Sequence, residues 1–454
     1  MQFISLPYLN AEDAFVGIKT GTYPVLLDSN APHSRDGRFD IAACDPLFVL
    51  SYTPGQGICL QDASGRILPC PDDPFLATEH LLLRFGQIST DADHPDIPFY
   101  GGLLGYWSYD LGRVVEHMPQ LADHDIVLPD MYLGLYSWAW VTDHAKRSSW
   151  LVIHPQCPYS AEFLIQRYLS QQASSEPSAF ELTSAWSSNM DRAQYGEKFR
   201  RVKDYIHAGD CYQVNLAQRF SANFQGDSWQ AYLRLRKQAP TPFAAYLSLP
   251  QGDICCLSPE RFLAVNHLQV ETKPIKGTIP RGTTTNEDQQ LMEQLRNSEK
   301  DRAENLMIVD LLRNDLGRSC EVGSVQVPLL FDVESYPNVH HLVSTVTGRL
   351  RNSADRLDLL KGAFPGGSIT GAPKIRAMEI IEELEPHRRS VYCGSIGYIS
   401  LHGRMDTNIA IRTVLFHQGQ AHCWAGGGLV ADSVEESEYQ ETLSKVGNLL
   451  RALA

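Results

Sequence analysis

The sequence predicts an α+β protein built mainly from antiparallel sheet, and three patterns support this prediction. The first half has short segments of alternating apolar and polar residues broken by Gly, Pro and Asp, which are typical of antiparallel strands. The second half adds longer segments with apolar residues at helical spacing. A Ser- and Gln-rich stretch between the halves is typical of a linker. The strand candidates are residues 23–27, 39–43, 66–68, 132–140 and 148–153, and the linker covers 170–179.

Composition limits the class of protein. The chain has 454 residues, 43% hydrophobic and 20% charged, which fits a soluble globular protein of two ordinary domains or one large α/β body. A formal net charge of −14 argues against nucleic-acid binding. The N-terminus has no signal-peptide pattern, and no apolar segment approaches the roughly 20 residues that span a bilayer. The 10 scattered cysteines, without a secretion signal, favour reduced thiols and a cytoplasmic location.

Four helices are expected in the second half from their start and stop signals. Ser298 can cap one of them, with Gly317 as its stop, and Pro373 suits the first position of another. A capping-box pattern at Ser433 opens the last helix. The helical segments are residues 191–208, 298–316, 373–384 and the stretch that begins at 433, and residues 213–220 are expected to form a strand.

Lys276 is the most informative residue of the chain. It lies in Pro-Ile-Lys-Gly-Thr, directly after the alternating segment 268–272. A lysine at a strand end beside a glycine can be held against a ligand, where desolvation or a nearby cation lowers its pKa and makes the amine nucleophilic. The alternative is a solvated lysine in a turn. Glu260 lies shortly upstream, and a short turn between strands would bring it to the same pocket as a general acid.

Charged residues also gather on two of the expected helices. Glu438, Glu441 and Lys445 share one helix face, and Glu304 precedes an apolar stretch. Mg2+ is usually held by one or two carboxylates together with substrate oxygens and water, so Glu304 and Glu441 are candidate ligands. A solvated charged stripe and a carboxylate near a helix N-terminus are the alternatives.

Two glycine-rich segments allow close approach of the backbone to a ligand. Residues 366–374 nearly match a phosphate loop, but Ala372 stands where the essential lysine belongs, which excludes ATP or GTP binding. The helix start there, with Lys374, favours an anion. Residues 426–428 are three consecutive glycines. Arg412, in an expected strand over 406–412, needs either a bound carboxylate or a structural ion pair.

Together these segments resemble the chorismate-utilising enzymes. The resemblance is strong over residues 190–450 and weaker before them. It implies a fold of two large, roughly orthogonal antiparallel sheets flanked by helices, with the site between the sheets. It also implies a chorismate-binding catalytic domain over residues 185–454, with an N-terminal region over 1–170 that packs onto this core. The matching segments are 101–106, 108–113, 209–216, 258–262, 274–278, 301–315, 340–344, 364–374, 394–398, 406–412, 426–428 and 438–442.

Within this family the lysine at 276 resembles the branch that makes 4-amino-4-deoxychorismate for folate synthesis. Anthranilate synthases have alanine at this place, whereas isochorismate and salicylate synthases use a nearby lysine to activate water. The resemblance implies that Lys276 attacks chorismate at C2, that Glu260 protonates the departing C4 hydroxyl, and that ammonia then adds at C4. His341 matches a histidine near the leaving group, with a structural histidine as the alternative.

The resemblance also implies the binding residues and the partners. Ammonia would come from a separate glutamine amidotransferase subunit, because no cysteine here lies in a Gly-x-Cys-x-Gly elbow. The implied Mg2+ ligands are Glu304, Glu438 and Glu441. The implied substrate-binding residues are Gly277, Thr278, Tyr392, Arg412, Gly426, Gly427, Gly428 and Lys445.

The N-terminal region resembles the tryptophan pocket of the family. Asp28 stands where feedback-regulated anthranilate synthases have glutamate, so bound tryptophan as a regulator, tryptophan as a structural ligand and plain core packing all stay open. Two rival functions follow: anthranilate synthase component I, which Lys276 argues against, and a tryptophan-binding regulatory subunit, which the catalytic glutamates argue against. The expected pocket residues are Ser29, Asp36, Gly37, Arg38, Phe39, Pro242, Phe243 and Ala244.

Overall fold

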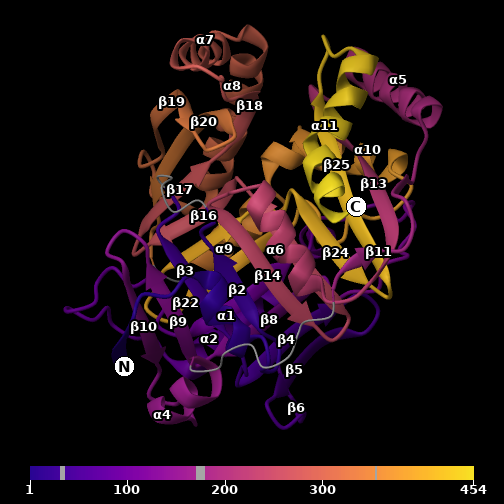
Figure 1. Ribbon diagram of the computed structural model, residues 1–454. Helices are drawn as coiled ribbons and strands as arrows, with labels where there is room; N and C mark the ends of the chain where they lie inside the picture. Colours follow the sequence, from indigo (N-terminus) through magenta and orange to yellow (C-terminus); the bar gives the residue numbers. More distant parts are fainter. Residues whose placement is uncertain (31–35, 170–178, 353–354) are drawn as a thin grey trace.

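Two large antiparallel sheets form the centre of the molecule, as the sequence predicts (Figure 1). The computed structural model describes residues 1–30, 36–169, 179–352 and 355–454. Within these residues the first sheet has 13 strands and the second has 12. The linker expected at 170–179 lies outside the described residues, apart from Ala179.

The first sheet joins strands from both ends of the chain. In spatial order it contains β1 (Gln2–Leu6), β10 (Ser148–Ile153), β9 (Trp138–Asp143), β3 (Phe39–Ala43), β2 (Val25–Asp28), β14 (Phe243–Leu249), β15 (Gly252–Ser258), β24 (Thr413–His417), β25 (Gln420–Leu429), β13 (Gln213–Gln225) and β11 (Glu181–Leu182). Two short strands, β12 (Ser187–Ser188) and β21 (Gly371–Ala372), also pair with β13. The junction of the two halves is the β2–β14 pair.

The second sheet carries the strands that position the candidate chemistry. In spatial order it contains β18 (Ile275–Pro280), β20 (Val339–Arg349), β17 (Gln269–Lys273), β16 (Arg261–Asn266), β23 (Met405–Asn408), β22 (Ser395–Ser400), β7 (Gly102–Trp107), β8 (Met131–Tyr136), β4 (Phe48–Thr53), β5 (Gly57–Asp62) and β6 (Ile67–Leu68), and β19 (Gln326–Ser335) pairs with β20. The β7–β22 pair joins the two halves of the chain here, so the N-terminal region shares both sheets with the rest of the chain.

Helices flank the sheets. They are α1 (Ala11–Ile18), α2 (Pro74–Phe85), α3 (Gly112–Val115), α4 (Ala161–Leu164), α5 (Arg192–Ala208), α6 (Ser228–Gln238), α7 (Thr285–Arg296), α8 (Glu299–Ser319), α9 (Asp355–Ala363), α10 (Lys374–Leu384) and α11 (Glu435–Leu453), with short helical segments η1 (Tyr109–Leu111), η2 (Ile165–Leu169) and η3 (Gly367–Ile369). No helix in the described parts of the chain is both long enough and apolar enough to cross a membrane.

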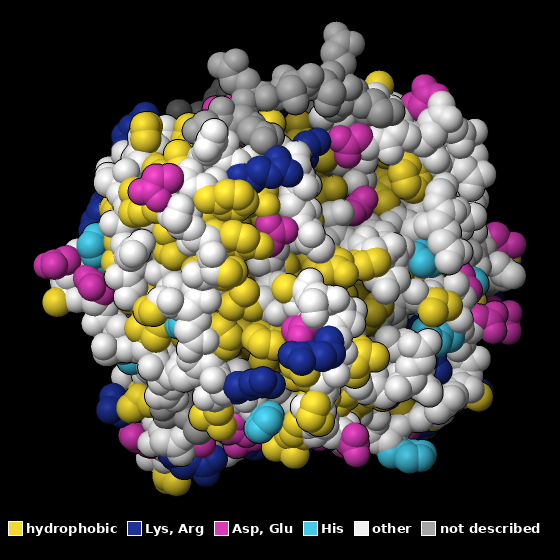
Figure 2. Space-filling model, turned by 90° about the horizontal axis from the view of Figure 1, so that it is seen from below, with side chains coloured by type: hydrophobic (Ala, Val, Ile, Leu, Met, Phe, Trp, Pro, Cys, Tyr) yellow, Lys and Arg dark blue, Asp and Glu magenta, His cyan; other side chains and the backbone are white. Residues whose placement is uncertain are grey.

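The main core lies where strands of both sheets bury their apolar side chains. Trp107, Leu263 and Ile396 from the second sheet and Ile254 and Leu415 from the first belong to one buried cluster. Full burial of each such side chain stabilises the fold by roughly 1.5–3 kcal/mol. On the face seen from below in Figure 2, hydrophobic side chains gather across the middle. This face lies at the end of the molecule opposite α8 and the start of α11 (Figure 1).

Two local expectations are wrong for physical reasons. The segment 132–140 was expected to be one strand, but the chain leaves the second sheet after Tyr136 and enters the first at Trp138. The buried Ser137 between them uses its carbonyl to accept the His154 N–H at 2.8 Å. Helix α8 does not stop at Gly317 but continues to Ser319. A glycine inside a helix costs only about 1 kcal/mol relative to alanine, which the burial of Leu316 and Ser319 on either side offsets.

The helix-start signals give mixed results. Ser298 caps α8 by accepting the Asp301 N–H at 3.3 Å, as expected. Asp191 and Gln194 form a capping box at the start of α5 that was not predicted. The capping box expected at Ser433 is wrong, because α11 begins one residue later and has no side-chain cap. The Ser433 hydroxyl instead donates to Glu438 at 2.7 Å.

Candidate active site

Glu260 and Lys276 come from two parts of the second sheet that are separated by β20 and β17 in its strand order. Glu260 directly precedes β16, and Lys276 lies in β18, with β17 between them in the chain. The Glu260 side chain is buried, and this burial raises its pKa to about 7. A hydrogen bond from the Ser368 hydroxyl and the charge of Lys276 both act against the shift. A carboxyl with this pKa holds a proton in neutral solution and can donate it.

Lys276 has the environment of an activated amine. Removal from water lowers its pKa, Lys445 adds to this effect, and the nearby acids Glu304, Glu260 and Glu441 oppose it. Its Nζ donates to the Ser368 carbonyl at 3.4 Å. Partial loss of the proton leaves a nucleophilic lone pair on the amine.

Ser368 links the two groups and was not predicted individually. It lies in η3, where its hydroxyl hydrogen-bonds Glu260 and its carbonyl accepts from Lys276. The signal that could have found it is the glycine-rich segment 366–374. The anion site expected at Lys374 is wrong, since that Nζ is held by Asp315 and by the Ala363 carbonyl, each at 2.9 Å.

Gly277 allows α8 to pack closely against β18. Its φ is 84°, in the left-handed region that favours glycine, and a Cβ there would lie 2.8 Å from Cγ of Asp301 in α8. Glu304 is one turn further along this helix. Gly277 therefore allows both the turn after Lys276 and the close packing of α8, which brings Glu304 toward Lys276.

Three glutamates face one another from α8 and α11. Lys300 connects them, with its Nζ 3.3 Å from Glu438 and 3.9 Å from Glu304. Glu441 pairs with Lys445 at 2.6 Å. Burial raises the pKa of Glu304, and the other two glutamates add to the rise. Figure 1 shows α8 and α11 on facing sides of the upper part of the molecule.

These glutamates are not assembled as a ready metal site. Among the described residues, no group of three His, Cys, Asp or Glu side chains is arranged to hold a metal ion. The donor set nevertheless fits Mg2+, a hard cation that prefers carboxylate oxygens. A Cβ on Gly427 would lie 3.2 Å from Glu438 Oε2 and 3.6 Å from Glu441 Oε1, so the glycine leaves space beside both carboxylates.

Arg412 is available for an anion. Strand β23 ends at Asn408, so the strand expected through residue 412 is too long, and Arg412 takes a left-handed φ of 53°. Within the described ranges its guanidinium forms no ion pair, so the structural ion pair that the sequence left open is absent there. Burial lowers its pKa, which Tyr392, Cys423 and Glu441 oppose. Tyr392 stacks on Trp424 with ring centroids 6.0 Å apart.

The three glycines of β25 bring backbone against two lysines. The Gly426 carbonyl accepts from Lys445 Nζ at 2.9 Å. A Cβ on Gly428 would lie 3.5 Å from Lys276 Nζ. A Cβ would lie 2.4 Å from Asn215 Oδ1 at Gly426 and 2.4 Å from Gln213 Nε2 at Gly428, so glycine lets this strand pack closely against β13 beside Lys276.

His341 is neutral in the fold. Burial, Arg412 and His340 lower its pKa to about 3. Its Nδ1 shares a 2.8 Å hydrogen bond with Thr278 Oγ1, which lies opposite it in the β18–β20 register. The imidazole can therefore exchange hydrogen bonds with a ligand, but it does not supply a proton at neutral pH.

A cavity of about 500 Å³ is lined by strands of both sheets, and its lining contains none of the candidate catalytic residues Lys276, Glu260 and His341. It contains seven of the eight residues expected around tryptophan, with only Gly37 absent from the lining: Ser29, Asp36, Arg38, Phe39, Pro242, Phe243 and Ala244. The carboxylate of Asp28, which also lines the cavity, already accepts from Tyr232 at 2.8 Å and from Arg236 at 2.5 Å.

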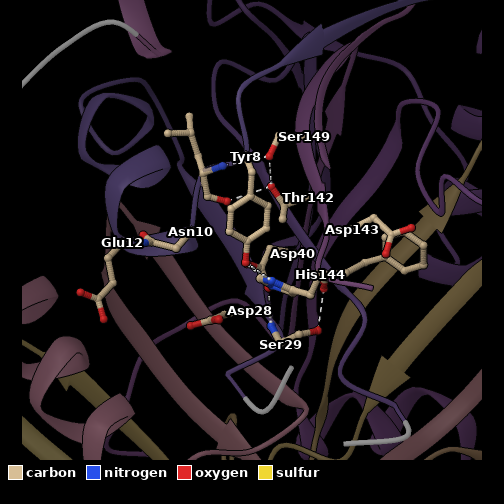
Figure 3. A network of polar contacts seen from close by, with 12 residues as sticks. Tyr8, Asn10, Glu12, Asp28, Ser29, Asp40, Thr142, Asp143, His144 and Ser149 are labelled. Carbon is tan, nitrogen blue, oxygen red and sulfur yellow. Dashed lines mark hydrogen bonds and ion pairs between the residues drawn. The ribbon is translucent and has the colours of Figure 1, made fainter. Parts of the chain in front are cut away.

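A buried polar network supports this cavity (Figure 3). Asp40 accepts the Ser29 N–H at 2.7 Å and lies 2.8 Å from Nε2 of His144. The other ring nitrogen of His144 meets the Tyr8 hydroxyl at 2.9 Å. These contacts fix the end of β2, where Ser29 follows Asp28, and so fix one wall of the cavity.

Comparison with known proteins places the chain in a family. Residues 45–451 match the model of the chorismate binding enzyme family. The chain belongs to this family. Among curated proteins, this chorismate binding enzyme is 50% identical to aminodeoxychorismate synthase component 1 of Escherichia coli (strain K12), over 98% of this chain and 96% of that protein. It is 42% identical to anthranilate synthase component 1 of Thermus thermophilus, over 79% of each.

The fold of the family is also shared with solved structures. Anthranilate synthase component I from Streptococcus pneumoniae TIGR4 superposes with a TM-score of 0.78 at 33% identity, covering 91% of this chain and 92% of that one. The fold and the family expected for this chorismate binding enzyme from its motifs are thus confirmed.

Proposed function

We propose that the chain is the large subunit of an aminodeoxychorismate synthase. It converts chorismate and ammonia to 4-amino-4-deoxychorismate on the route to 4-aminobenzoate and folate. The observation that carries this proposal is the pairing of Lys276, whose pKa is lowered, with Glu260, whose pKa is raised to about 7. The similarity to several proteins named aminodeoxychorismate synthase component 1, at 38–50% identity, supports the same reading.

The first half of the reaction uses both groups. The uncharged amine of Lys276 forms a bond to C2 of chorismate, both ring double bonds shift by one position (C1=C2 to C1=C6, and C5=C6 to C4=C5), and the C4–O bond breaks. Glu260 gives its proton to the departing hydroxyl, which leaves as water. The positive charge then resides on the new secondary ammonium, and Glu260 is a carboxylate. Splitting one substitution into two steps is ordinary nucleophilic catalysis.

The second half reverses the first with a different nucleophile. Ammonia forms a bond to C4, both ring double bonds shift back, and the C2–N bond to Lys276 breaks to return the free amine. The C4 ammonium passes one proton to Glu260, which restores the acid. Chorismate and ammonia thereby give 4-amino-4-deoxychorismate and water, with the enzyme unchanged.

Substrate binding would use the charged groups around this pair. Arg412, Tyr392 and the backbone of 426–428 would take the enolpyruvyl carboxylate, with Gly277 and Thr278 against the ring. Glu304, Glu438 and Glu441 would hold Mg2+, which supplies positive charge to neutralise the ring carboxylate. Lys445 adds a further positive charge. An acidic chain can thus bind a dianion by concentrating cations locally.

The ammonia would be delivered by a glutamine amidotransferase subunit in a cytoplasmic heterodimer. The word "component" in the names of the relatives supports a second subunit.

The cavity of about 500 Å³ would hold L-tryptophan. Phe39, Pro242 and Phe243 supply apolar walls for an indole, while Arg38 and Asp36 supply opposite charges for an amino acid. Mass spectrometry of the denatured protein would reveal tryptophan carried through purification. Titration of tryptophan into ligand-free protein that releases no heat would contradict this assignment.

Product analysis tests the main proposal. The protein is incubated with chorismate, Mg2+ and excess ammonium, and the products are identified by mass spectrometry. We expect 4-amino-4-deoxychorismate and no anthranilate. Anthranilate as the main product would instead assign the chain to the anthranilate synthases, and no consumption of chorismate would favour a regulatory subunit.

A further inference from the structure

Asp36 bridges two buried basic side chains. Its Oδ1 accepts from Arg261 at 2.8 Å and its Oδ2 accepts from Lys273 at 2.6 Å. The side chains of all three residues are about one-tenth exposed or less. Although burial alone would raise the pKa of Asp36, the two cations hold it below its usual value. The carboxylate is therefore charged, and both ion pairs are sheltered from solvent screening.

The two basic residues adjoin the two reacting residues in the chain. Arg261 follows Glu260 directly, and Lys273 precedes Lys276 by three positions. Arg261 and Lys273 also lie opposite each other in the β16–β17 register. One carboxylate thus ties the start of β16, next to Glu260, to the end of β17, from which the chain continues into β18 and Lys276.

The sheet is irregular at this point. The β16–β17 register shifts between Arg261 and Ala264, and the β16–β23 register shifts between Arg261 and Leu263. A bulge disrupts the regular ladder and re-aims the side chains beside it. Backbone hydrogen bonds therefore hold the beginning of β16 less tightly than its middle. The ion pairs of Asp36 with Arg261 and Lys273, here called the clamp, add side-chain contacts at this point.

The clamp extends to the strand of His341. Lys273 Nζ also donates to Glu334 at 2.6 Å. Glu334 lies in β19 opposite His341 of β20, and His341 in turn shares a hydrogen bond with Thr278. Through Asp36 the N-terminal region thus joins the ion pairs of Arg261 and Lys273, which lie next to Glu260 and Lys276 in the chain.

We propose that Asp36 is a positioning residue that fixes Glu260 and Lys276 relative to each other through Arg261 and Lys273. It acts only through these neighbours, so its loss changes the rate of the chemical step more than the binding of substrate. The inference rests on the proposed function only in naming Glu260 and Lys276 as the reacting groups.

Kinetics of Asp36→Asn test this role, because asparagine keeps the shape and removes the charge. We expect kcat per folded molecule to fall roughly 10- to 100-fold, the cost of a displacement of about 1 Å at the reacting atoms. The KM for chorismate should change far less. Lys273→Met should lower kcat to a similar extent. Because Lys273 does not line the cavity, this loss would not come from a change in the cavity. The double variant should have a kcat no lower than that of the slower single variant. Asp36→Glu, which restores the charge, should recover part of the rate.

Asp96→Asn is the matched control. Asp96 also bridges two basic residues, Arg38 at 3.0 Å and Lys146 at 2.8 Å, but neither adjoins a reacting residue. Its kcat should equal that of the unaltered protein. The proposal is overturned if Asp36→Asn lowers only the melting temperature, if its kcat matches that of Asp96→Asn, or if the losses of the double variant add. The rate of each variant is compared with that of the unaltered protein for whichever product forms. A product other than 4-amino-4-deoxychorismate would therefore contradict the proposed function, but it would not contradict the positioning role of Asp36.

Discussion

Glu260 and Lys276 perturb each other in a shared buried environment. Burial raises the pKa of Glu260 to about 7, and the neighbouring ammonium of Lys276 limits that rise. Burial lowers the pKa of Lys276, and Glu260 is among the acids that limit that fall. Burial thus favours the uncharged form of both groups, the protonated acid and the free amine.

Replacing Lys276 with alanine should abolish the protein-bound intermediate. Without the amine, no bond to C2 can form, and direct displacement at C4 must proceed without covalent assistance. Intact-protein mass spectrometry after mixing with chorismate in the absence of ammonia should show an adduct in the unaltered protein and none in Lys276→Ala. The control is Lys237→Ala, an exposed lysine of α6, which should keep both adduct and turnover. Unchanged turnover in Lys276→Ala would remove the covalent mechanism.

Replacing Glu260 with glutamine should slow the enzyme and stabilise the fold in alkaline solution. The pKa of Glu260 is about 7 in the folded protein and ordinarily 4.5, so ionisation opposes folding as pH rises between these values. Below about pH 4.5 the protein and the variant should be equally stable, and above pH 7 the variant should gain up to about 3 kcal/mol. Melting temperatures at pH 4.5 and pH 8 measure this difference, and a variant less stable at pH 8 would contradict it.

The motifs of this chain predict the site better than the boundaries of its elements. Lys276, Glu260 and Glu304 were expected from residue type and spacing, and the fold brings them within mutual electrostatic reach. Such residues are recognisable because chemistry restricts which side chains can stand there. The glycines were predictable for the same reason, since φ of Gly277 and the space at Gly427 exclude larger residues.

Contacts between distant segments were not predictable from local pattern. Ser433 was expected to cap a helix, but its hydroxyl oxygen accepts the Val430 N–H at 3.0 Å and its O–H donates to the buried Glu438. The chain passes from the second sheet to the first at Ser137. The alternation of apolar and polar residues alone cannot distinguish this passage from one long strand. Asp36 meets Lys273 more than 200 positions away, and no local sequence signal contains that pairing.

Removing Lys300 should strengthen Mg2+ binding in the absence of chorismate. Its ammonium lies 3.3 Å from Glu438 and 3.9 Å from Glu304, so a divalent cation among these carboxylates must displace it. Lys300→Met keeps much of the side-chain volume and removes the competing charge. Titration calorimetry should show a lower Kd for Mg2+ in the variant. Glu441→Gln should bind Mg2+ more weakly than the unaltered protein, and a Kd unaffected by either change would place the metal elsewhere.

Removing the guanidinium of Arg412 should weaken chorismate binding. Within the described residues Arg412 has no ion-pair partner, so its charge is free for a carboxylate. Loss of a hydrogen bond to a charged group costs about 1.5–3 kcal/mol, which predicts a KM increase of roughly 10- to 150-fold in Arg412→Met. Arg412→Lys should recover only part of the affinity, because an ammonium cannot form the two parallel hydrogen bonds of a guanidinium. Arg313→Met, at an exposed ion pair of α8, is the control and should keep the original KM. If Arg412→Met binds chorismate normally and loses only kcat, the carboxylate is held by other groups.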